Sequence, residues 1–337
     1  MKIGVLMSGG VDSSVAAWLL LQQGHAVEGI TMINWSEEIS RSAQNAADAL
    51  KIPLRLIDLR QEFSALVIEN FCSTYKQGQT PNPCVVCNEK VKFGLLLQRA
   101  LGLGFEQIAT GHYARILAKK IPELHTGLDL SKDQSYFLYR LNQEQLEHLV
   151  FPLGELDKAE VRKIAAEAKL PAAQIKDSQE ICFITKDYQS FIAGRVTSAP
   201  GKFIDLAGNK LGNHRGLPFY TVGQRKGLGI SAQQPLYVLA LNPQRNEITL
   251  GENQSLFSNT LQISQVHWID QPTADGSAVE AKIRYAAPRT PAKVSSSPDG
   301  SWQVTFNEPQ RAITPGQSVV FYHDSQVLGG GIIQAAD

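Results

Sequence analysis

The chain has 337 residues, a length at which two or three domains are expected. Hydrophobic residues make up 43% and charged residues 19%, which fits globular packing and excludes intrinsic disorder. No stretch reaches the ~18 apolar residues of a membrane span, and the first apolar run stops too early for a signal peptide. We therefore expect a cytoplasmic protein with no membrane partner. Four cysteines are too few for a disulfide scaffold, so closely spaced ones would be metal ligands or catalytic groups.

The charge of the chain is balanced overall but uneven along its length. Lys and Arg number 32, as do Asp and Glu, so the net charge does not announce a nucleic-acid partner. Residues 195–235 nevertheless contain a single acid, Asp205, and six bases: Arg195, Lys202, Lys210, Arg215, Arg225 and Lys226. The middle of the chain is therefore its basic part.

The first 170 residues alternate between strand and helix patterns. Residues 3–7 are a continuous apolar run, which predicts a strand buried on both faces, and residues 12–22 then predict a helix with Asp12 or Ser13 near its N-cap. Further strands are predicted at 26–33, 53–59 and 107–110, and further helices at 39–50, 61–76, 89–101 and 157–169. This alternation predicts an α/β domain with a doubly wound parallel sheet.

After about residue 198, short β-rich runs replace the helical periodicity. They lie at 236–240, 246–250, 279–285 and 302–306. We expect a catalytic α/β domain over residues 1–197, a small β-rich central domain over 198–270 and a C-terminal β-barrel over 271–337.

A loop rich in glycine and serine follows the first strand. Its residues, Ser8-Gly9-Gly10-Val11-Asp12-Ser13-Ser14, let backbone N–H groups and a helix N-terminus face an anion, with hydroxyls as added donors. The chain lacks G-x-x-x-x-G-K-[ST], so this is not the ordinary P-loop. The loop resembles that of the N-type ATP pyrophosphatases, which cleave ATP between the α and β phosphates and adenylate a substrate oxygen. That superfamily holds small-molecule synthetases and tRNA-thiolating enzymes, and the loop alone does not choose between them.

Two cysteine segments make the choice. Residues 80–88 read TPNPCVVCN and residues 177–184 read DSQEICFI. Together with ATGHY at 109–113, KDQSYFL at 132–138, TVGQRKGLGI at 221–230, PGQ at 315–317 and LGGGII at 328–333, they resemble the bacterial tRNA-uridine 2-sulfurtransferases (tRNA-specific 2-thiouridylases). The resemblance covers essentially the whole chain in the family's order.

The chemistry of such a reaction explains the need for cysteine. Uridine C2 is a poor electrophile, and adenylation converts its oxygen into a good leaving group, AMP. Sulfur must then arrive on a nucleophile, and the thiolate is the reactive form, so we expect Lys90, Lys92 and the following helix N-terminus to lower a thiol pKa. The resemblance implies that Cys87 is the attacking cysteine. It also implies that Cys182 carries the sulfur as a persulfide, which Cys87 releases by forming a disulfide.

The resemblance also implies the binding residues. ATP, with Mg²⁺, would contact Leu6, Met7, Ser8, Gly9, Gly10, Val11, Asp12, Ser13, Met32 and Gly111. The tRNA would contact Asn82, Pro83, Cys84, Lys132, Asp133, Gln134, Arg284 and Tyr285.

Cys84 departs from the family pattern. Many members carry Asp there, with an acid–base role near the target uridine. C-x-x-C with a distant third cysteine is also the ligand count of a [4Fe–4S] cluster with one open iron, so Cys84, Cys87 and Cys182 are candidate cluster ligands. A zinc site would want a fourth ligand, and no histidine is near in sequence. Both mechanisms stay open; we favour the cluster because the relay needs only two cysteines. Cys72 matches no motif, and we interpret it as structural.

The resemblance implies ATP-dependent 2-thiolation of the wobble uridine, position 34, of tRNAs for Lys, Glu and Gln, with AMP and pyrophosphate as products. It implies a persulfide donor, such as a cysteine desulfurase or a sulfur carrier protein. A small-molecule adenylating synthetase is the alternative enzyme, but it has no need of the three cysteines. An RNA-binding module with a metal-stabilised C-x-x-C is the non-enzymatic alternative, and it leaves the loop at residues 8–14 unexplained.

Overall fold

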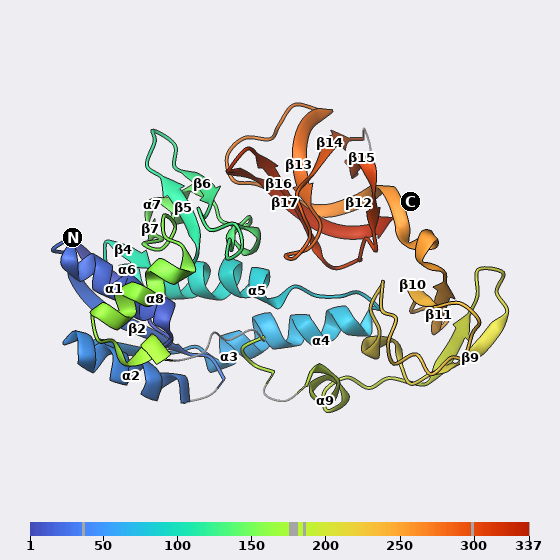
Figure 1. Ribbon diagram of the computed structural model, residues 1–337, viewed down its shortest axis with the longest axis horizontal. Helices are drawn as coiled ribbons and strands as arrows, with labels where there is room; N and C mark the ends of the chain where they lie inside the picture. Colours follow the sequence, from blue (N-terminus) through green and yellow to red (C-terminus); the bar gives the residue numbers. More distant parts are fainter. Residues whose placement is uncertain (36–37, 175–180, 185–186, 298–299, 337) are drawn as a thin grey trace.

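The computed structural model describes residues 1–35, 38–174, 181–184, 187–297 and 300–336 (Figure 1). An α/β domain at the N-terminal end and a small β-sheet at the opposite end are joined by helices that include α4 (Glu69–Lys76) and α5 (Pro83–Val86). The C-terminal barrel lies over these helices (Figure 1). Among the described residues, no helix is both long and apolar enough to cross a membrane.

The first sheet is parallel throughout and doubly wound, as predicted. Its strand order is β3-β2-β1-β4-β7. The strands are β1 (Lys2–Leu6), β2 (Ala26–Ile33), β3 (Leu54–Asp58), β4 (Gln107–Ala109) and β7 (Leu149–Val150). The strand order reverses between β1 and β4, so their C-terminal ends open a crevice at the point where such sheets bind ligands.

Helices cover both faces of this sheet. On one face, α1 (Val11–Gln22) contacts α2 (Glu38–Leu50) and α8 (Lys158–Glu167), and they share one apolar core with Ile3 and Val5 of β1. On the other face a second core, which includes Ile30 and Ile108, packs on two long helical segments. A capping box fixes the start of α8, because Asp157 accepts from the N–H of Glu160 at 2.7 Å and Glu160 accepts from the N–H of Asp157 at 2.8 Å.

Each of the two long helical segments has a π-helical middle. One runs through α3 (Arg60–Phe63), η1 (Ser64–Ile68) and α4, and the other runs through α5, η2 (Cys87–Leu96) and α6 (Leu97–Gly102). The second helix was predicted from residue 89 but begins at Pro83, because Asn82 Oδ1 accepts from the N–H of Val85 at 3.5 Å and proline suits the first helical position. Cys84 and Cys87 therefore lie on the helix rather than in a loop before it.

The smaller elements of the first half are short. They comprise β5 (Ala114–Leu117), β6 (Glu123–Thr126), η3 (Ser135–Phe137), α7 (Gln143–Glu147), η4 (Pro171–Gln174) and α9 (Tyr188–Ala193). The central sheet has the order β10-β11-β8-β9, with β8 (Gly201–Ile204), β9 (Lys210–His214), β10 (Tyr237–Asn242) and β11 (Glu247–Gly251). Two 3₁₀ turns, η5 (Leu217–Phe219) and η6 (Asn253–Leu256), flank it. The β-rich character predicted for this part is confirmed.

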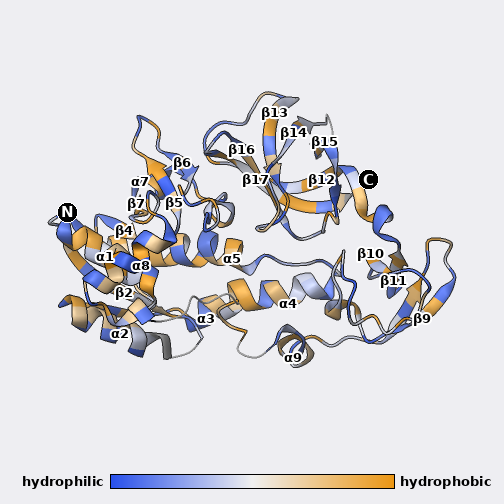
Figure 2. Ribbon diagram, viewed as in Figure 1, coloured by the Kyte–Doolittle hydropathy of each residue, from blue (hydrophilic) through white to orange (hydrophobic). Residues whose placement is uncertain are grey.

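The C-terminal strands close into a six-stranded barrel, as expected. The strands are β12 (Phe257–Trp268), β13 (Ser277–Lys282), β14 (Thr290–Ser296), β15 (Trp302–Arg311), β16 (Ser318–His323) and β17 (Gln326–Ala336). Their order is β12-β15-β14-β13-β16-β17, and β12 also pairs with β17. Hydrophobic and hydrophilic residues alternate along these strands in Figure 2, because one face fills the barrel. The first strand of the barrel, β12, begins at Phe257. The sequence analysis placed the boundary between the central domain and the barrel later, at residue 270.

The hairpin of β5 and β6 links the first domain to the barrel. Strand β6 adds to the edge of β17, with Gln326 opposite His125. His125 then hydrogen-bonds across the junction to Ser325, with 2.9 Å between Nδ1 and Oγ. The sequence analysis missed both strands of this hairpin.

Candidate functional site

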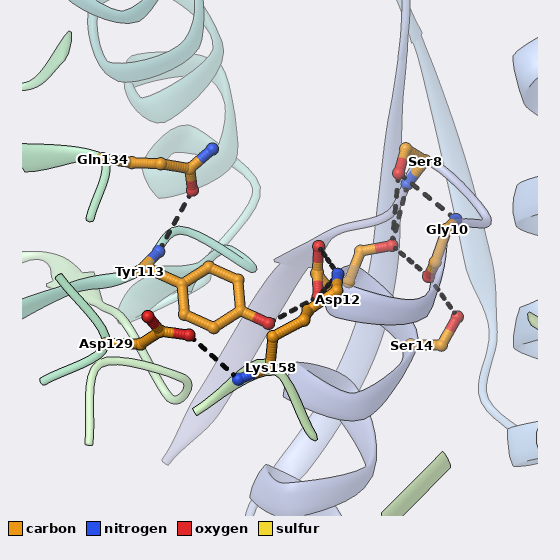
Figure 3. Close-up of polar contacts among 9 residues, drawn as sticks. Ser8, Gly10, Asp12, Ser14, Tyr113, Asp129, Gln134 and Lys158 are labelled. Atoms are coloured by element: carbon orange, nitrogen blue, oxygen red, sulfur yellow. Dashed lines mark hydrogen bonds and ion pairs between the residues drawn. The ribbon is translucent and has the colours of Figure 1, made fainter. Parts of the chain in front are cut away.

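The loop after β1 is a tight turn held by its own serine side chains (Figure 3). Gly9 has φ +77°, and a Cβ there would lie 2.3 Å from the carbonyl carbon of Ser42, so no larger residue fits. Serine hydroxyls brace the turn: Ser13 Oγ accepts from the N–H of Ser8 at 3.3 Å, and Ser14 Oγ donates to Gly10 O at 2.9 Å. The N-terminus of α1 therefore faces an open crevice, as the predicted anion site requires.

The end of β4 packs directly on this loop. A Cβ at Gly111 would lie 2.8 Å from the carbonyl carbon of Asp12 and 2.9 Å from the backbone nitrogen of Ser13. Glycine is required here because the two backbones approach too closely for a side chain. Gly111 thus lies against the loop on the wall of the crevice.

An ion pair that the sequence analysis missed holds Asp12 (Figure 3). Lys158 Nζ lies 2.8 and 2.9 Å from the two carboxylate oxygens of Asp12, and Tyr113 Oη donates to the same carboxylate at 2.8 Å. The Lys158 side chain is only 13% exposed. Lys158 opens helix α8, and no local pattern distinguishes it from a surface lysine, because its partner is 146 residues away in the chain.

A cavity of about 420 Å³, here called the front cavity, joins the loop to the cysteines. Its wall includes most predicted ATP-site residues and all three predicted site cysteines: Leu6, Met7, Ser8, Asp12, Ser13, Met32, Gly111, Cys84, Cys87 and Cys182. Gly9 and Gly10 shape the loop without lining the cavity, and Val11 is buried in the core. The volume falls within the roughly 300–1,000 Å³ of small-molecule sites. Further wall residues, Asn34, Asn88, Lys92, His112 and Phe137, were not predicted as contacts.

All four cysteines of the chain are free thiols. Cys87 is buried, Cys84 and Cys182 are exposed, and all three line the front cavity. Phe183 anchors the Cys182 segment, since it is buried against the rings of Phe63 and Phe71 at 5.8 and 5.3 Å. Residues 177–180 of the second cysteine motif lie outside the described residues.

The thiols in the front cavity hold their protons. Burial raises the pKa of Cys87 to about 12. The pKa values of Cys84 and Cys182 are also raised, because the surrounding protein desolvates their thiols even though both residues are exposed. The charge of Lys92 acts on all three thiols and lowers each pKa, but less than burial raises it. The expected lowering of a thiol pKa by two lysines is therefore wrong in this structure. Lys90 lies on the other side of the helix and lines a separate cavity.

The three thiols are not arranged as a metal site. Among the described residues, no three His, Cys, Asp or Glu side chains form a group that could hold a metal ion. Cys84, Cys87 and Cys182 nevertheless line the same front cavity, so the iron–sulfur cluster remains a prediction. Asp12, by contrast, is an acid on the cavity wall beside the loop, which is the donor type that Mg²⁺ bridging to phosphates requires.

His112 is a neutral imidazole on the wall of the front cavity. Burial lowers its pKa well below the ordinary value, with a further lowering by Lys92. Its Nδ1 lies 2.7 Å from Thr110 Oγ1, and the ring packs between Phe93 and Phe151 at 5.8 and 5.9 Å. These contacts fix the ring in place.

The predicted tRNA residues of the first domain divide among several environments. Pro83, Cys84 and Gln134 line the front cavity, whereas Asn82 lines the cavity behind the helix. Asp133 is buried and accepts from the N–H groups of Gly127 and Ser135 and from the Ser135 hydroxyl, so it shapes its own turn. Lys132 is half-buried and lines neither cavity.

The two predicted tRNA residues of the barrel, Arg284 and Tyr285, also lie in different environments. The guanidinium of Arg284 points inward and donates to Ala312 O and Thr314 Oγ1. Tyr285 is 40% exposed and stacks on Phe137, with ring centroids 4.6 Å apart and planes 33° apart. Because Phe137 also lines the front cavity, Tyr285 brings an aromatic face of the barrel to its edge.

Three protein families match the chain in sequence. The family described as "tRNA methyl transferase HUP domain" matches residues 1–186, "tRNA methyl transferase PRC-barrel domain" matches 189–252, and "Aminomethyltransferase beta-barrel domain" matches 258–333. A tRNA-specific 2-thiouridylase MnmA of Syntrophomonas wolfei subsp. wolfei is 51% identical, covering 99% of this chain and 100% of that protein. The same-named protein of Magnetococcus marinus is 45% identical, covering 98% of each.

A solved structure gives a weaker likeness. A 4-thiouridine synthetase in complex with RNA and bound ATP is 21% identical and has a TM-score of 0.37, covering 54% of this chain and 44% of that one. This likeness is too weak to support an inference.

The doubly wound sheet, its loop and the matched families define a tRNA-modifying enzyme with a HUP domain. The near-complete coverage by relatives makes the assignment more specific. The chain belongs to the tRNA-specific 2-thiouridylase family, and it is a tRNA sulfurtransferase. The small-molecule synthetase and the non-enzymatic RNA module are therefore set aside.

Proposed function

We propose that this enzyme adenylates the C2 oxygen of the wobble uridine, position 34, with ATP and then replaces that oxygen by sulfur. The observation that carries the proposal is the front cavity, in which the loop of Ser8, Asp12 and Ser13 and the thiols of Cys87 and Cys182 share one wall. Adenylation takes place on the C2 oxygen and sulfur transfer on C2 itself, one bond away, so both steps require such a shared cavity.

In the first step, the loop residues bind the phosphates. Backbone N–H groups at the N-terminus of α1 neutralise the charge on the triphosphate, and Lys158 turns from Asp12 towards the phosphates. Asp12 would hold Mg²⁺, which neutralises phosphate charge. Met32 and Gly111 contact the adenine nucleotide. The uridine C2 oxygen attacks the α-phosphorus, and the bond to pyrophosphate breaks.

In the second step, a persulfide on Cys182 supplies the sulfur. Its terminal sulfur attacks C2, the C2–O bond breaks, and AMP leaves with the former uridine oxygen. Cys87 then attacks the inner sulfur of Cys182, the S–S bond to the transferred sulfur breaks, and a Cys87–Cys182 disulfide forms. A dithiol reductant restores the two thiols. Cys84, on the helix one turn before Cys87, is proposed as a proton donor, because its raised pKa keeps it protonated.

The partners follow from this chemistry. The substrates proposed are the tRNAs for Lys, Glu and Gln, and the sulfur comes from a persulfide protein, either a cysteine desulfurase or a sulfur carrier. The place of action proposed is the cytoplasm. Arg225 and Lys226, exposed in the basic loop of the central domain, are proposed to contact the tRNA backbone.

The test is an assay with purified full-length protein, tRNA, ATP and a persulfide donor. We expect AMP and pyrophosphate in equal amounts and 2-thiouridine at position 34, all dependent on tRNA. Asp12→Ala should abolish AMP formation while tRNA affinity is retained, and Asp157→Asn, in the α8 capping box, serves as a control that keeps AMP formation. AMP formation at the wild-type rate in Asp12→Ala would contradict the proposed loop function.

A further inference from the structure

Asn34 places a buried side-chain amide beside the sulfur of Cys182. The residue directly follows β2, and its side chain lines the front cavity although only 5% of the residue is exposed. Its Nδ2 donates a hydrogen bond to Cys182 Sγ over 3.9 Å. The bond is long because the sulfur of a neutral thiol is a large and weak acceptor. The two residues are 148 positions apart in the chain, so only the fold brings them together.

A second hydrogen bond fixes the orientation of this amide. Asn34 Oδ1 accepts from the backbone N–H of Trp35 at 3.0 Å. An amide turned over would direct its oxygen at the sulfur and its NH₂ group at the N–H of Trp35, so both hydrogen bonds would be lost. The NH₂ group therefore faces Cys182, and among the described residues it has no other acceptor.

The backbone around Cys182 adds two more donors. The N–H groups of Cys182 itself and of Phe183 hydrogen-bond the sulfur and lower the pKa of its thiol, although desolvation raises that pKa by more. Residues 181–184 form a turn, in which the N–H of Ile184 donates to Ile181 O at 2.9 Å, and the buried ring of Phe183 anchors it. The sulfur is thus held in one place with three N–H groups directed at it.

The other two thiols of the front cavity lack such donors. Among the described residues, none donates a hydrogen bond to the sulfur of Cys84 or Cys87. The charge of Lys92 acts on all three thiols, so it does not single out one of them. Hydrogen bonds to an ionised acceptor are roughly twice as strong as those to a neutral one. Cys182 is therefore the sulfur in this cavity whose surroundings favour a negative charge.

We infer that the Asn34 amide selects Cys182, rather than Cys84 or Cys87, as the thiol that accepts sulfur from the persulfide donor. In this step the Cys182 sulfur attacks the outer sulfur of the donor, and a new S–S bond forms. The S–S bond of the donor breaks, and its inner sulfur leaves and takes the proton that Cys182 gave up. The Asn34 amide stabilises the charge on the attacking sulfur until the new bond forms. This inference rests on the proposed function, in which Cys182 carries the persulfide.

The test measures sulfur loading on the full-length protein without ATP or tRNA. Cysteine persulfide is the donor, and mass spectrometry of peptides alkylated with iodoacetamide reports the added sulfur atom at each cysteine. The wild type should load mainly Cys182. Asn34→Leu removes the donor and should load Cys182 about tenfold more slowly, as expected for one hydrogen bond to a charged group.

A second variant keeps the shape of the side chain. Asn34→Asp retains an acceptor for the N–H of Trp35 but puts a carboxylate beside the sulfur, so Cys182 should load still more slowly than in Asn34→Leu. Asn45→Asp, at an exposed position of α2, makes the same change of charge and should load Cys182 as the wild type does. Cys72 lies outside the front cavity, and its wild-type alkylation rate in every variant checks that the protein is folded.

Two results would overturn the inference. In one, Cys182 loads at the wild-type rate in both Asn34 variants. In the other, iodoacetamide labels Cys182 faster in Asn34→Leu than in the wild type, which would mean that Asn34 only holds the segment in place and that its loss exposes the thiol. Failure of the proposed function is distinguishable, because it would appear as absence of 2-thiouridine with the wild-type protein while sulfur is still loaded on Cys182.

Discussion

At the residue scale, the front cavity controls the protonation of its thiols. Burial raises the pKa of Cys87 to about 12, so almost none of it is thiolate near neutral pH, and Lys92 is the cation that opposes this effect. If Cys87 attacks as proposed, a change in its surroundings must first lower its pKa. Entry of an adenylated uridine, or movement of Lys92, would provide that change.

Replacing Lys92 with Gln should raise the thiol pKa values still further. We expect Cys87 and Cys182 to react roughly three- to tenfold more slowly with iodoacetamide at pH 8, because less thiolate is present. Mass spectrometry of the labelled peptides gives the rates. Lys90→Gln is the matched control, since Lys90 lies behind the helix, and its rates should equal those of the wild type. Equal rates in the two variants would show that Lys92 does not act on the thiols.

The pH dependence of the same reaction has a definite sign. Because burial raises the Cys87 pKa, its labelling rate in the wild type should increase about tenfold for each pH unit between 8 and 10 without levelling off. The raised pKa also stabilises the fold, and that contribution should be lost as the pH rises from about 9 towards 12. A plateau below pH 9 would mean that Cys87 is not buried in solution.

Cys84 distinguishes the two sulfur mechanisms. The ligand count favours a cluster, but the three thiols in the structure are not gathered as ligands, so we expect Cys84→Ser to thiolate tRNA with a persulfide donor and no iron. Anaerobic purification with iron and sulfide analysis, alongside the thiolation assay, provides the measurement. Loss of both bound iron and thiolation in Cys84→Ser, with adenylation intact, would instead establish the cluster.

At the element scale, the sequence predicted the strands and helices whose formation depends on local residue patterns. The long strands β1, β2 and β3 and the helices α1, α2 and α8 were predicted to within a few residues, because each has a strong period and clear ends. Strands β5 and β6 were missed because they are four residues long and the edge they join, β17, is about 200 residues away. The inward turn of Arg284 and the reach of Lys158 to Asp12 likewise depend on tertiary contacts.

Replacing Gly111 tests whether the end of β4 must lie close against the loop after β1. In Gly111→Ala the new Cβ would lie under 3.0 Å from the backbone of Asp12 and Ser13, so the loop must move. We expect ATP affinity, measured by calorimetry, to fall at least tenfold while the protein stays folded. Gly102→Ala, where an added Cβ meets nothing within 4 Å, is the control and should bind ATP normally. Unchanged affinity in Gly111→Ala would remove the end of β4 from the nucleotide site.

At the scale of the whole molecule, the chain has three parts: the α/β domain, the central β-rich domain and the C-terminal barrel. The first domain holds the loop and the thiols, and the barrel brings Tyr285 to Phe137. The central sheet lies at the opposite end of the molecule from the first domain (Figure 1), and its domain carries the exposed Arg225 and Lys226. A substrate large enough to touch all three is expected, and a folded tRNA has that size. Although the net charge of the chain is zero, residues 195–235 of the central domain are locally basic.

Arg225→Ala/Lys226→Ala tests this arrangement. Each lost phosphate contact reduces the number of counterions released, so tRNA affinity should fall and the slope of log K against log salt should flatten by about two. Lys163→Ala, on exposed α8 of the first domain, is the control and should keep the wild-type slope. An unchanged slope in the double variant would remove the loop from the interface.

The central claim is that the oxygen leaving uridine leaves as part of AMP. The most direct measurement uses tRNA with ¹⁸O at C2 of uridine 34, in a single turnover with ATP and a persulfide donor, followed by mass spectrometry of the products. The account predicts one ¹⁸O atom in each AMP formed, matched by one 2-thiouridine. Unlabelled AMP, with the ¹⁸O released to water or phosphate, would contradict it.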